Sequence, residues 1–158
     1  MRSRSSGFTL IELILVMLIV VVVMAVTAPS MRDFLYGRKT ANAVNQIVSL
    51  AHHGRSKAIV EGRTYRMSLE AASGTFWLDA QDGGDFKELG TESGQRFDLP
   101  EGTKAAWVIP EGGEPREFVR FYADGRCEPG TLTITGSQGE KIELGAPSES
   151  ELWHVLSQ

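Results

Sequence analysis

A single carboxylate interrupts the most apolar stretch of the chain. Residues 8–28 contain no charged side chain except Glu12. A carboxylate in the middle of a bilayer costs on the order of 2.5–3.5 kcal/mol, and an ionisable residue in such a segment usually marks a function or a partner. Glu12 is therefore the first candidate functional residue, and it needs a partner.

The segment around Glu12 is long enough to cross a membrane as a helix. At about 1.5 Å per residue, its length comes to roughly 31 Å, near the hydrocarbon thickness of a bilayer. Arg2 and Arg4 precede it and favour a cytoplasmic N-terminus, although further basic residues follow it and weaken the contrast. The alternative is an ordinary secretory signal, with a cleavage site at Val23-Met24-Ala25.

A second signal surrounds Glu12. The segment Ser6-Gly7-Phe8-Thr9-Leu10-Ile11-Glu12-Leu13 resembles the type III signal of type IV pilins and type II secretion pseudopilins. The resemblance implies cleavage by prepilin peptidase between Gly7 and Phe8, N-methylation of Phe8, and a role for Glu12 in assembly. Glu12 of one subunit would then pair with the Phe8 amine of the next, which lowers the cost of burying both charges. The alternative is that Glu12 only extends to the lipid headgroups.

A long helix is predicted to continue beyond the apolar segment. Pro29 predicts a kink, and no other proline occurs before Gly62, which is a stop signal. A proline in this place also resembles many pilins. The second part of the helix carries an apolar stripe at helical spacing, which has to cover something apolar. The stripe consists of Val44, Ile47, Val48, Ala51, Ala58 and Ile59, and Arg55 interrupts it.

After Gly62 the apolar residues alternate, which is typical of strands. Residues 65–69 and 75–78, joined by Ser73-Gly74, predict a hairpin. Further strands are predicted at 95–99, 105–109, 117–122, 131–135, 141–144 and 151–156. Frequent Gly and Pro between them favour antiparallel meanders. The expected fold class is α+β and type IV pilin-like, with a long N-terminal helix packed on an antiparallel β-rich head.

The head carries a resemblance of its own. Residues 121–134, Phe-Tyr-Ala-Asp-Gly-Arg-Cys-Glu-Pro-Gly-Thr-Leu-Thr-Ile, are similar to a glycine-rich segment of the GspH/FimT family, the H-type minor pseudopilins and their relatives among minor type IV pilins. Residues 51–59 also resemble the helix end of that family. Ala123 replaces the usual proline, and Pro129 stands at a frequent glycine position. The resemblance implies a GspH-like subunit.

The resemblance also implies a domain plan and a place in the cell. Residues 1–7 form the leader peptide and 8–30 the transmembrane and assembly helix. Residues 31–158 form the periplasmic head, with an amphipathic helix to about residue 62 and β-sheets over 64–158. The subunit is then a single-pass inner-membrane protein with a cytoplasmic N-terminus, and it is incorporated into the pseudopilus.

The implied function is structural. A minor pseudopilin near the tip of the type II secretion pseudopilus helps to drive export of folded periplasmic proteins, and it is not an enzyme. The implied partners are major and minor pseudopilins, prepilin peptidase, the inner-membrane secretion platform and membrane lipid. Two alternatives remain: a FimT-like minor pilin in pilus assembly or DNA uptake, and a plain signal-anchored periplasmic binding domain.

The charge distribution separates the stalk from the head. Residues 32–66 carry seven basic and two acidic side chains, whereas residues 67–158 carry seven basic and 17 acidic ones. Binding to a nucleic acid requires clustered Lys and Arg to neutralise phosphates. The acidic head therefore argues against a nucleic-acid partner.

Several other polar and aromatic residues predict no chemistry. Asp79, Asp82, Asp85 and Glu88 are predicted to form a solvated acidic turn rather than a calcium loop, because their spacing is three. His52 and His53 point about 100° apart on a helix and His154 has no visible partner, so no metal site is predicted. Cys127 is the only cysteine, which excludes an internal disulfide. Trp77, Trp107 and Trp153 are expected in the core or an interface. No cofactor or catalytic motif is found in the sequence.

Overall fold

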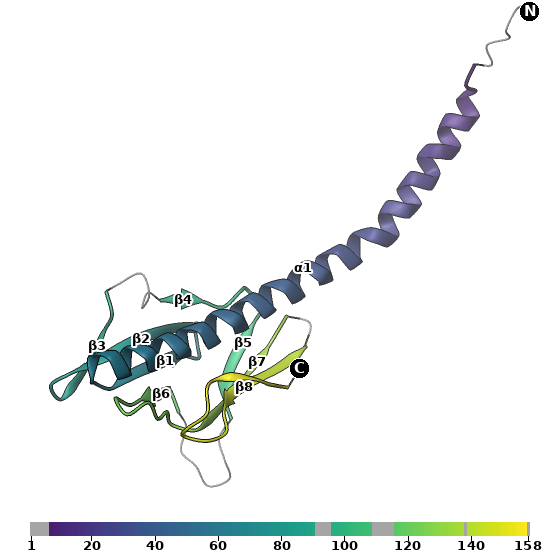
Figure 1. Cartoon of the computed structure of the whole chain (residues 1–158). Coiled ribbons are helices and arrows are strands. Elements are labelled where there is room, and N and C mark those ends of the chain that lie inside the picture. The colour runs from purple at the N-terminus through teal and green to yellow at the C-terminus, as the bar shows by residue number, and fades with distance from the viewer. Residues whose placement is uncertain (1–6, 91–95, 109–115, 138, 158) are drawn as a thin grey trace, which may run out of the picture. The chain divides into compact units, whose positions relative to one another are not determined.

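The computed structural model describes residues 7–90, 96–108, 116–137 and 139–157, and it leaves the side chains of residues 26–37 undescribed. The chain forms two compact units, Met1–Leu35 and Tyr36–Gln158. The second unit is the head, and it combines the end of a long helix with two antiparallel sheets (Figure 1).

One helix, α1, extends from Leu10 to Glu61. The expected continuation of the helix beyond Pro29 is confirmed, since the helical backbone is unbroken there. The kink expected at Pro29 lies outside the described side chains and stays a prediction. Gly62 ends the helix with a φ of 67°, a left-handed conformation that favours glycine. The predicted stop signal is confirmed.

A polar cluster stabilises the end of α1. The Glu61 carboxylate accepts hydrogen bonds from the Tyr65 hydroxyl at 2.6 Å and from Lys57 Nζ at 2.9 Å, and it also pairs with Arg63. These donors, the Tyr65 hydroxyl first, lower the pKa of Glu61 to about 2. A depressed carboxyl pKa stabilises the folded state above the ordinary pKa near 4.5. This stabilisation is lost as the pH falls towards 2.

The strands form two antiparallel sheets. Sheet 1 has the order β3-β2-β1-β6 with β4 beside β2, and sheet 2 has the order β5-β7-β8-β9. The strands are β1 (Tyr65–Glu70), β2 (Thr75–Asp82), β3 (Asp85–Glu88), β4 (Phe97–Asp98), β5 (Lys104–Trp107), β6 (Phe118–Phe121), β7 (Gly130–Thr135), β8 (Lys141–Ala146) and β9 (His154–Ser157). Each strand that the sequence predicted has a counterpart, so the α+β, pilin-like class is confirmed.

The predicted hairpin forms at β1 and β2. Glu70 pairs with Thr75, and the turn between them places Gly74 at a φ of 71°. The register sends alternate side chains to the two faces of sheet 1. Met67 and Leu78 lie on the buried inner face, whereas Ser68 and Trp77 lie opposite one another on the outer face.

The predicted acidic turn is wrong in part. Asp79 lies inside β2 and is only 3% exposed, because β2 continues four residues beyond the predicted strand. Asp82 and Asp85 flank a two-residue turn, Gly83-Gly84, and β3 follows, a strand that the sequence did not predict. The acidic residues, spaced by three, belong to a hairpin and not to one loop. Because side chains alternate along a strand, Asp79 and Asp82 lie on different faces.

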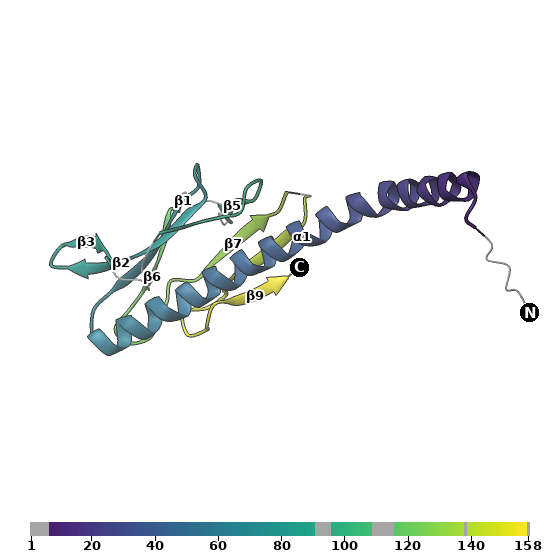
Figure 2. The same cartoon turned by 90° about the horizontal axis from the view of Figure 1, so that it is seen from above.

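The head part of α1 lies across both sheets (Figure 2). Near Thr40 it meets sheet 2, where the Thr40 hydroxyl donates to Glu140 at 3.2 Å. Near Gly54 it meets sheet 1, and a Cβ added at Gly54 would lie 3.0 Å from Leu78 and from Phe121. Glycine at this position lets the helix approach the sheet closely.

Most of the predicted stripe faces the core. Five members are buried or partly buried: Val44, Ile47, Val48, Ala51 and Ala58. The prediction for Ile59 is wrong, since this side chain is 52% exposed. Residue 59 lies 100° around the helix from residue 58, so one of the two must leave a narrow stripe. Arg55 is half-buried at the edge of the stripe. The buried residue at this level of the helix is Gly54.

We expect the stripe to carry much of the stability of the head. Ile47→Ala removes a fully buried side chain and should lower the free energy of unfolding by about 2–5 kcal/mol. Ile59→Ala is the matched control and should cost less than about 1 kcal/mol. Urea unfolding of the detergent-solubilised chain, followed by tryptophan fluorescence, measures both. Equal losses would contradict this assignment of the core.

Candidate functional site

The residues of the predicted cleavage motif surround the start of α1. Gly7, Phe8 and Thr9 lie outside the helix, and Glu12 lies in its first turn. The Glu12 N–H donates to the Thr9 carbonyl at 3.1 Å and to the Thr9 hydroxyl at 3.4 Å. Thr9 is therefore the N-cap of α1 and Glu12 its third residue.

Thr9 was not among the residues predicted to have a role at the N-terminus. Threonine followed three residues later by glutamate is the pattern of a capping box, and Thr9 and Glu12 have this spacing. The pattern was therefore visible in the printed sequence. The cap fixes where the helix begins and leaves the peptide between Gly7 and Phe8 outside it.

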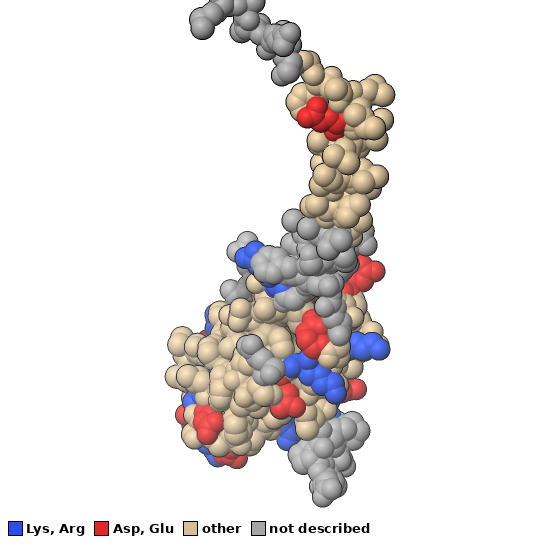
Figure 3. All heavy atoms as spheres, turned by 90° about the vertical axis from the view of Figure 1, so that its right-hand side faces the viewer, with Lys and Arg blue, Asp and Glu red and all other residues tan. Residues whose placement is uncertain are grey.

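The first part of α1 presents a bare apolar surface. Its large apolar side chains from Phe8 to Met24 are all between 40% and 80% exposed. Figure 3 shows this segment as an uncharged surface with an acidic group. This group is Glu12, because the sequence of the segment contains no other acidic residue. An apolar surface of this extent requires a cover of lipid or protein. Within the part of the chain that the structure describes, no helix is long and apolar enough to span a membrane.

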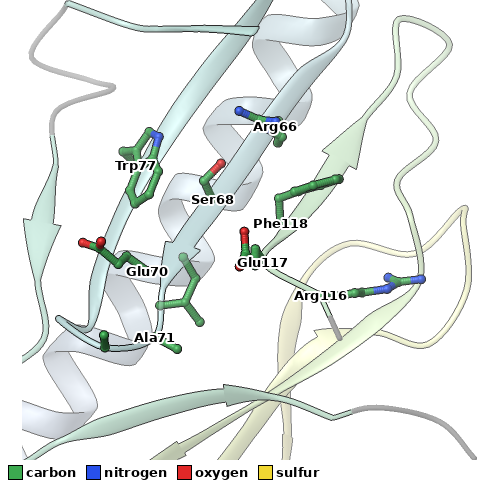
Figure 4. Close-up of a pocket in the computed structure, with 10 residues that line it drawn as sticks. Arg66, Ser68, Glu70, Ala71, Trp77, Arg116, Glu117 and Phe118 are labelled. Atoms are coloured by element: carbon green, nitrogen blue, oxygen red, sulfur yellow. The ribbon is translucent and has the colours of Figure 1, made fainter. Parts of the chain in front are cut away.

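A second candidate site is a groove of about 450 Å³ on the outer face of sheet 1. We call it the head groove, and its lining comprises Arg66, Ser68, Leu69, Glu70, Ala71, Ala72, Trp77, Arg116, Glu117 and Phe118. Ser68 on β1 pairs with Trp77 on β2 and with Phe118 on β6. A small residue therefore lies between two aromatic ones at the centre of the groove (Figure 4).

A buried carboxylate supports the head groove from one side. Asp79 accepts hydrogen bonds from Arg66 Nε at 2.9 Å, Ser68 Oγ at 2.7 Å and Trp77 Nε1 at 2.9 Å. Burial of a charge is costly unless it is paired and hydrogen-bonded, and Asp79 meets both conditions. This network fixes the Trp77 side chain, and its residues form no arrangement of nucleophile and base.

Arginines lie against the aromatic residues of the same face. The Arg96 guanidinium lies 4.3 Å from the centre of the Trp77 ring, and Arg66 lies 5.0 Å from that of Phe118. Both arginines also form ion pairs, Arg96 with Glu88 and Arg66 with Asp79. Aromatic and arginine side chains are enriched in protein interfaces, so the outer face of sheet 1 has the composition of a contact surface.

The histidines form no metal site. No group of three metal-ligating side chains occurs among the described residues. His52 instead donates through Nε2 to the Trp153 carbonyl at 2.7 Å. Arg55 donates to the carbonyls of Ser150 and Glu151. Side chains of α1 therefore hold the segment that precedes β9.

The three tryptophans have different surroundings. Trp107 and Trp153 are buried and meet edge to face, with ring centres 5.7 Å apart. Trp77 is half-buried in the wall of the head groove. The expectation of core or interface aromatics is confirmed for Trp107 and Trp153, which belong to the core.

Comparison with known families identifies the head. The sequence pattern of the family described as type II transport protein GspH matches residues 43–146, about two thirds of the chain. The chain belongs to the GspH family. The pattern described as the prokaryotic N-terminal methylation motif matches residues 2–28. No curated protein sequence matches the chain.

Solved structures show the same fold at low sequence identity. The minor pseudopilin EpsH from the type II secretion system of Vibrio cholerae is 14% identical, with a TM-score of 0.63 over 75% of this chain and 97% of that one. The Escherichia coli GspH structure is 14% identical, with a TM-score of 0.55 over 77% and 89%. The Pseudomonas aeruginosa type IV minor pilin FimU is 12% identical, with a TM-score of 0.58 over 77% and 91%.

As a GspH family member, the chain is a minor pseudopilin of the type II secretion system. The predicted family resemblance and the predicted function are thereby confirmed. The family is one of structural subunits.

The family segment around residue 125 forms a tight turn after β6. Gly125 has a φ of 84°, and the Arg126 backbone N–H donates to the Asp124 carboxylate at 3.0 Å. The Tyr122 N–H donates to the Arg126 carbonyl at 2.8 Å and closes the turn. The turn forms although Ala123 replaces the usual proline, because Asp124 and Gly125 supply the hydrogen bond and the positive φ.

Cys127 lies directly after this turn and is fully buried. Its Sγ lies 3.5 Å from the Glu151 carbonyl, to which the thiol donates. Burial is the main cause that raises the pKa of the Cys127 thiol. The cysteine therefore behaves as a small core residue and not as a nucleophile.

We expect slow chemical modification of Cys127 in the folded protein. Iodoacetamide at pH 8 should alkylate the native chain more than about tenfold more slowly than the urea-unfolded chain, because the thiolate is disfavoured and inaccessible. Intact mass spectrometry over time measures the two rates. Equal rates would show that Cys127 is accessible.

Proposed function

We propose that this GspH family member is stored as a single-pass inner-membrane subunit and then built into the pseudopilus near its tip. Residues 1–7 are the leader, 8–30 the membrane and assembly helix, and 31–158 the periplasmic head. The N-terminus is cytoplasmic. The N-terminal methylation pattern over residues 2–28 and the family of the head support this arrangement.

The observation that carries the proposal is the bare helix with one carboxylate at its start. The exposed apolar side chains from Phe8 to Met24 need lipid around the stored subunit and neighbouring helices in a filament. Glu12 lies in the first helical turn, three residues after the cap Thr9 and four residues after Phe8. Cleavage after Gly7 would create a positive amine there.

Pairing between subunits follows from this chemistry. An amine on Phe8 of one subunit and the Glu12 carboxylate of its neighbour are opposite charges at the same end of their helices. Their contact would offset part of the cost of removing both from water. The contact also fixes the register of one helix against the next, as single polar residues do in other helical assemblies.

The further partners follow from the same proposal. Prepilin peptidase removes the leader and methylates Phe8, the secretion platform delivers the subunit, and major and minor pseudopilins surround it. The filament drives export of folded periplasmic proteins. The head takes part as a structural subunit, without catalytic activity and without a cofactor.

A minor pilin of the FimT kind, acting in pilus assembly or DNA uptake, is the second candidate. The fold shared with the minor pilin FimU supports it. The acidic head, with 17 acidic and seven basic side chains over residues 67–158, argues against a DNA-binding role. Deletion of the gene separates the two candidates, because a pseudopilin is required for secretion of periplasmic enzymes and a pilin for pili or transformation.

We expect the mature protein to begin at Phe8. Intact mass spectrometry of the purified membrane protein should give the mass of residues 8–158 with one added methyl group. Gly7→Leu should leave an uncut precursor, because a bulky residue then precedes the cleaved bond. A mature chain that begins at Val26 would indicate an ordinary signal peptidase and would contradict the proposal.

We expect Glu12→Ala to impair assembly into the filament without affecting insertion into the membrane. Removal of a charge from an apolar segment favours insertion, so cleavage and membrane levels should stay normal. Incorporation should fall by at least about tenfold, because the neighbouring amine loses its partner. Glu12→Lys should be worse, since it places two cations together. Co-purification with partner pseudopilins at equal membrane levels measures the effect.

The alternative role of Glu12 gives the opposite result. If Glu12 only extends to the headgroups, Glu12→Ala should assemble as the wild type does. A result of this kind would remove the pairing hypothesis, while leaving the family of the head unchanged.

A further inference from the structure

The head groove has the features of a recognition site for one side chain. We propose that it binds a lysine or arginine side chain of a partner protein. This contact goes beyond the proposed function, because neither the N-terminal motif nor the filament contact of Glu12 involves the outer face of sheet 1. Its test also stands independently of them.

The walls of the head groove are aromatic and held in place before any partner arrives. Trp77 and Phe118 lie on strands on either side of Ser68. Neighbouring strands are about 4.8 Å apart, so the two outer strands are separated by roughly 10 Å. Because the Ser68 side chain is small, the space between the Trp77 and Phe118 rings stays open. Figure 4 shows Ser68 between these two rings.

Two contacts hold the Trp77 ring rigid. Its Nε1 donates to Asp79 at 2.9 Å, and Arg96 covers one of its faces at 4.3 Å from the ring centre. A rigid aromatic residue costs little entropy when a partner binds. Aromatic faces also attract cations, and tryptophan does so most strongly.

The charges of the head groove favour a cationic partner. The Arg66 guanidinium is neutralised by the buried Asp79 at 2.8 Å. Arg116 donates to the Pro129 carbonyl at 2.6 Å, and in Figure 4 it lies apart from the centre of the groove. Glu70 and Glu117 also line the groove, and neither forms an ion pair with any residue that the structure describes.

The shape and the charge therefore specify the same kind of group. Among the described residues that line the groove, two carboxylates, Glu70 and Glu117, have no ion pair, whereas Arg116 is the one arginine without a carboxylate partner. The unpaired groups therefore leave an excess of negative charge. The exposed methyl groups of Ala71 and Ala72 add apolar lining for an aliphatic stem. Lysine and arginine combine such a stem with a terminal cation, whereas a glutamate or a leucine satisfies only one of the two conditions.

The test uses the full chain in an uncharged detergent, with its tryptophan indoles labelled with ¹⁵N. The probe is the peptide acetyl-Gly-Arg-Gly-amide. We expect the Trp77 indole signal to shift saturably, with a dissociation constant in the millimolar range. The buried Trp107 and Trp153 signals serve as internal controls and should stay unmoved. Trp77→Phe assigns the signal by removing it.

Charge variants test the specificity of the site. Glu117→Gln should weaken binding of the arginine peptide about two- to fivefold, the range of an exposed ion pair. Glu143→Gln removes the same charge from sheet 2 and should leave the affinity unchanged. Equal effects of the two variants would show attraction to the net charge alone and would overturn the proposal.

Control peptides distinguish the other occupants. The same peptide with norleucine in place of arginine keeps the stem without the charge, and the peptide with glutamate reverses the charge. Both should bind at least several-fold more weakly. Equal binding of the norleucine peptide would mean an apolar site, stronger binding of the glutamate peptide would mean an anion site, and the absence of a Trp77 shift with arginine would mean no site. Each of these results overturns the proposal.

Discussion

Packing of one helical stripe against two sheets is the interaction on which the head depends. Sheet 1 and sheet 2 are small, and each has a single apolar face that needs a cover. The stripe of α1 supplies this cover, since its members from Val44 to Ala58 are buried or partly buried in the core. Full burial of each aliphatic side chain contributes about 1.5–3 kcal/mol to the free energy of folding. The helix and the sheets share this stabilisation, because each buries the apolar face of the other. Neither sheet could bury its inner face alone.

The same helix has a different requirement in its first part. From Phe8 to Met24 its apolar side chains are exposed on all sides, so no single stripe can satisfy them. A helix of this kind depends on lipid or on neighbouring protein to cover its apolar side chains. The Thr9 cap fixes the start of this helix, and therefore the position of Glu12 relative to Phe8.

The two faces of sheet 1 divide the tasks of the head. Its inner face packs on α1 through residues such as Met67 and Leu78. Its outer face carries a buried Asp79, aromatic rings and arginines, held in a network of hydrogen bonds and ion pairs. Burial of Asp79 costs desolvation, which its ion pair and hydrogen bonds offset. The head groove is formed over this network.

Local sequence patterns predict the order of the elements and the motif at the N-terminus. Helical spacing before Gly62 and alternation after it are local patterns, and so are the motif around Glu12 and the hairpin at Ser73-Gly74. Which side of each pattern is buried depends on how the helix and the sheets pack together. Ile59 left the stripe because the helix meets the sheet through Ala58, and Asp79 became buried because its strand pairs on both sides. Burial depends on partners far apart in the chain, and local spacing contains no information about them. The head groove exists for the same reason, since β1, β2 and β6 meet only after the chain has folded.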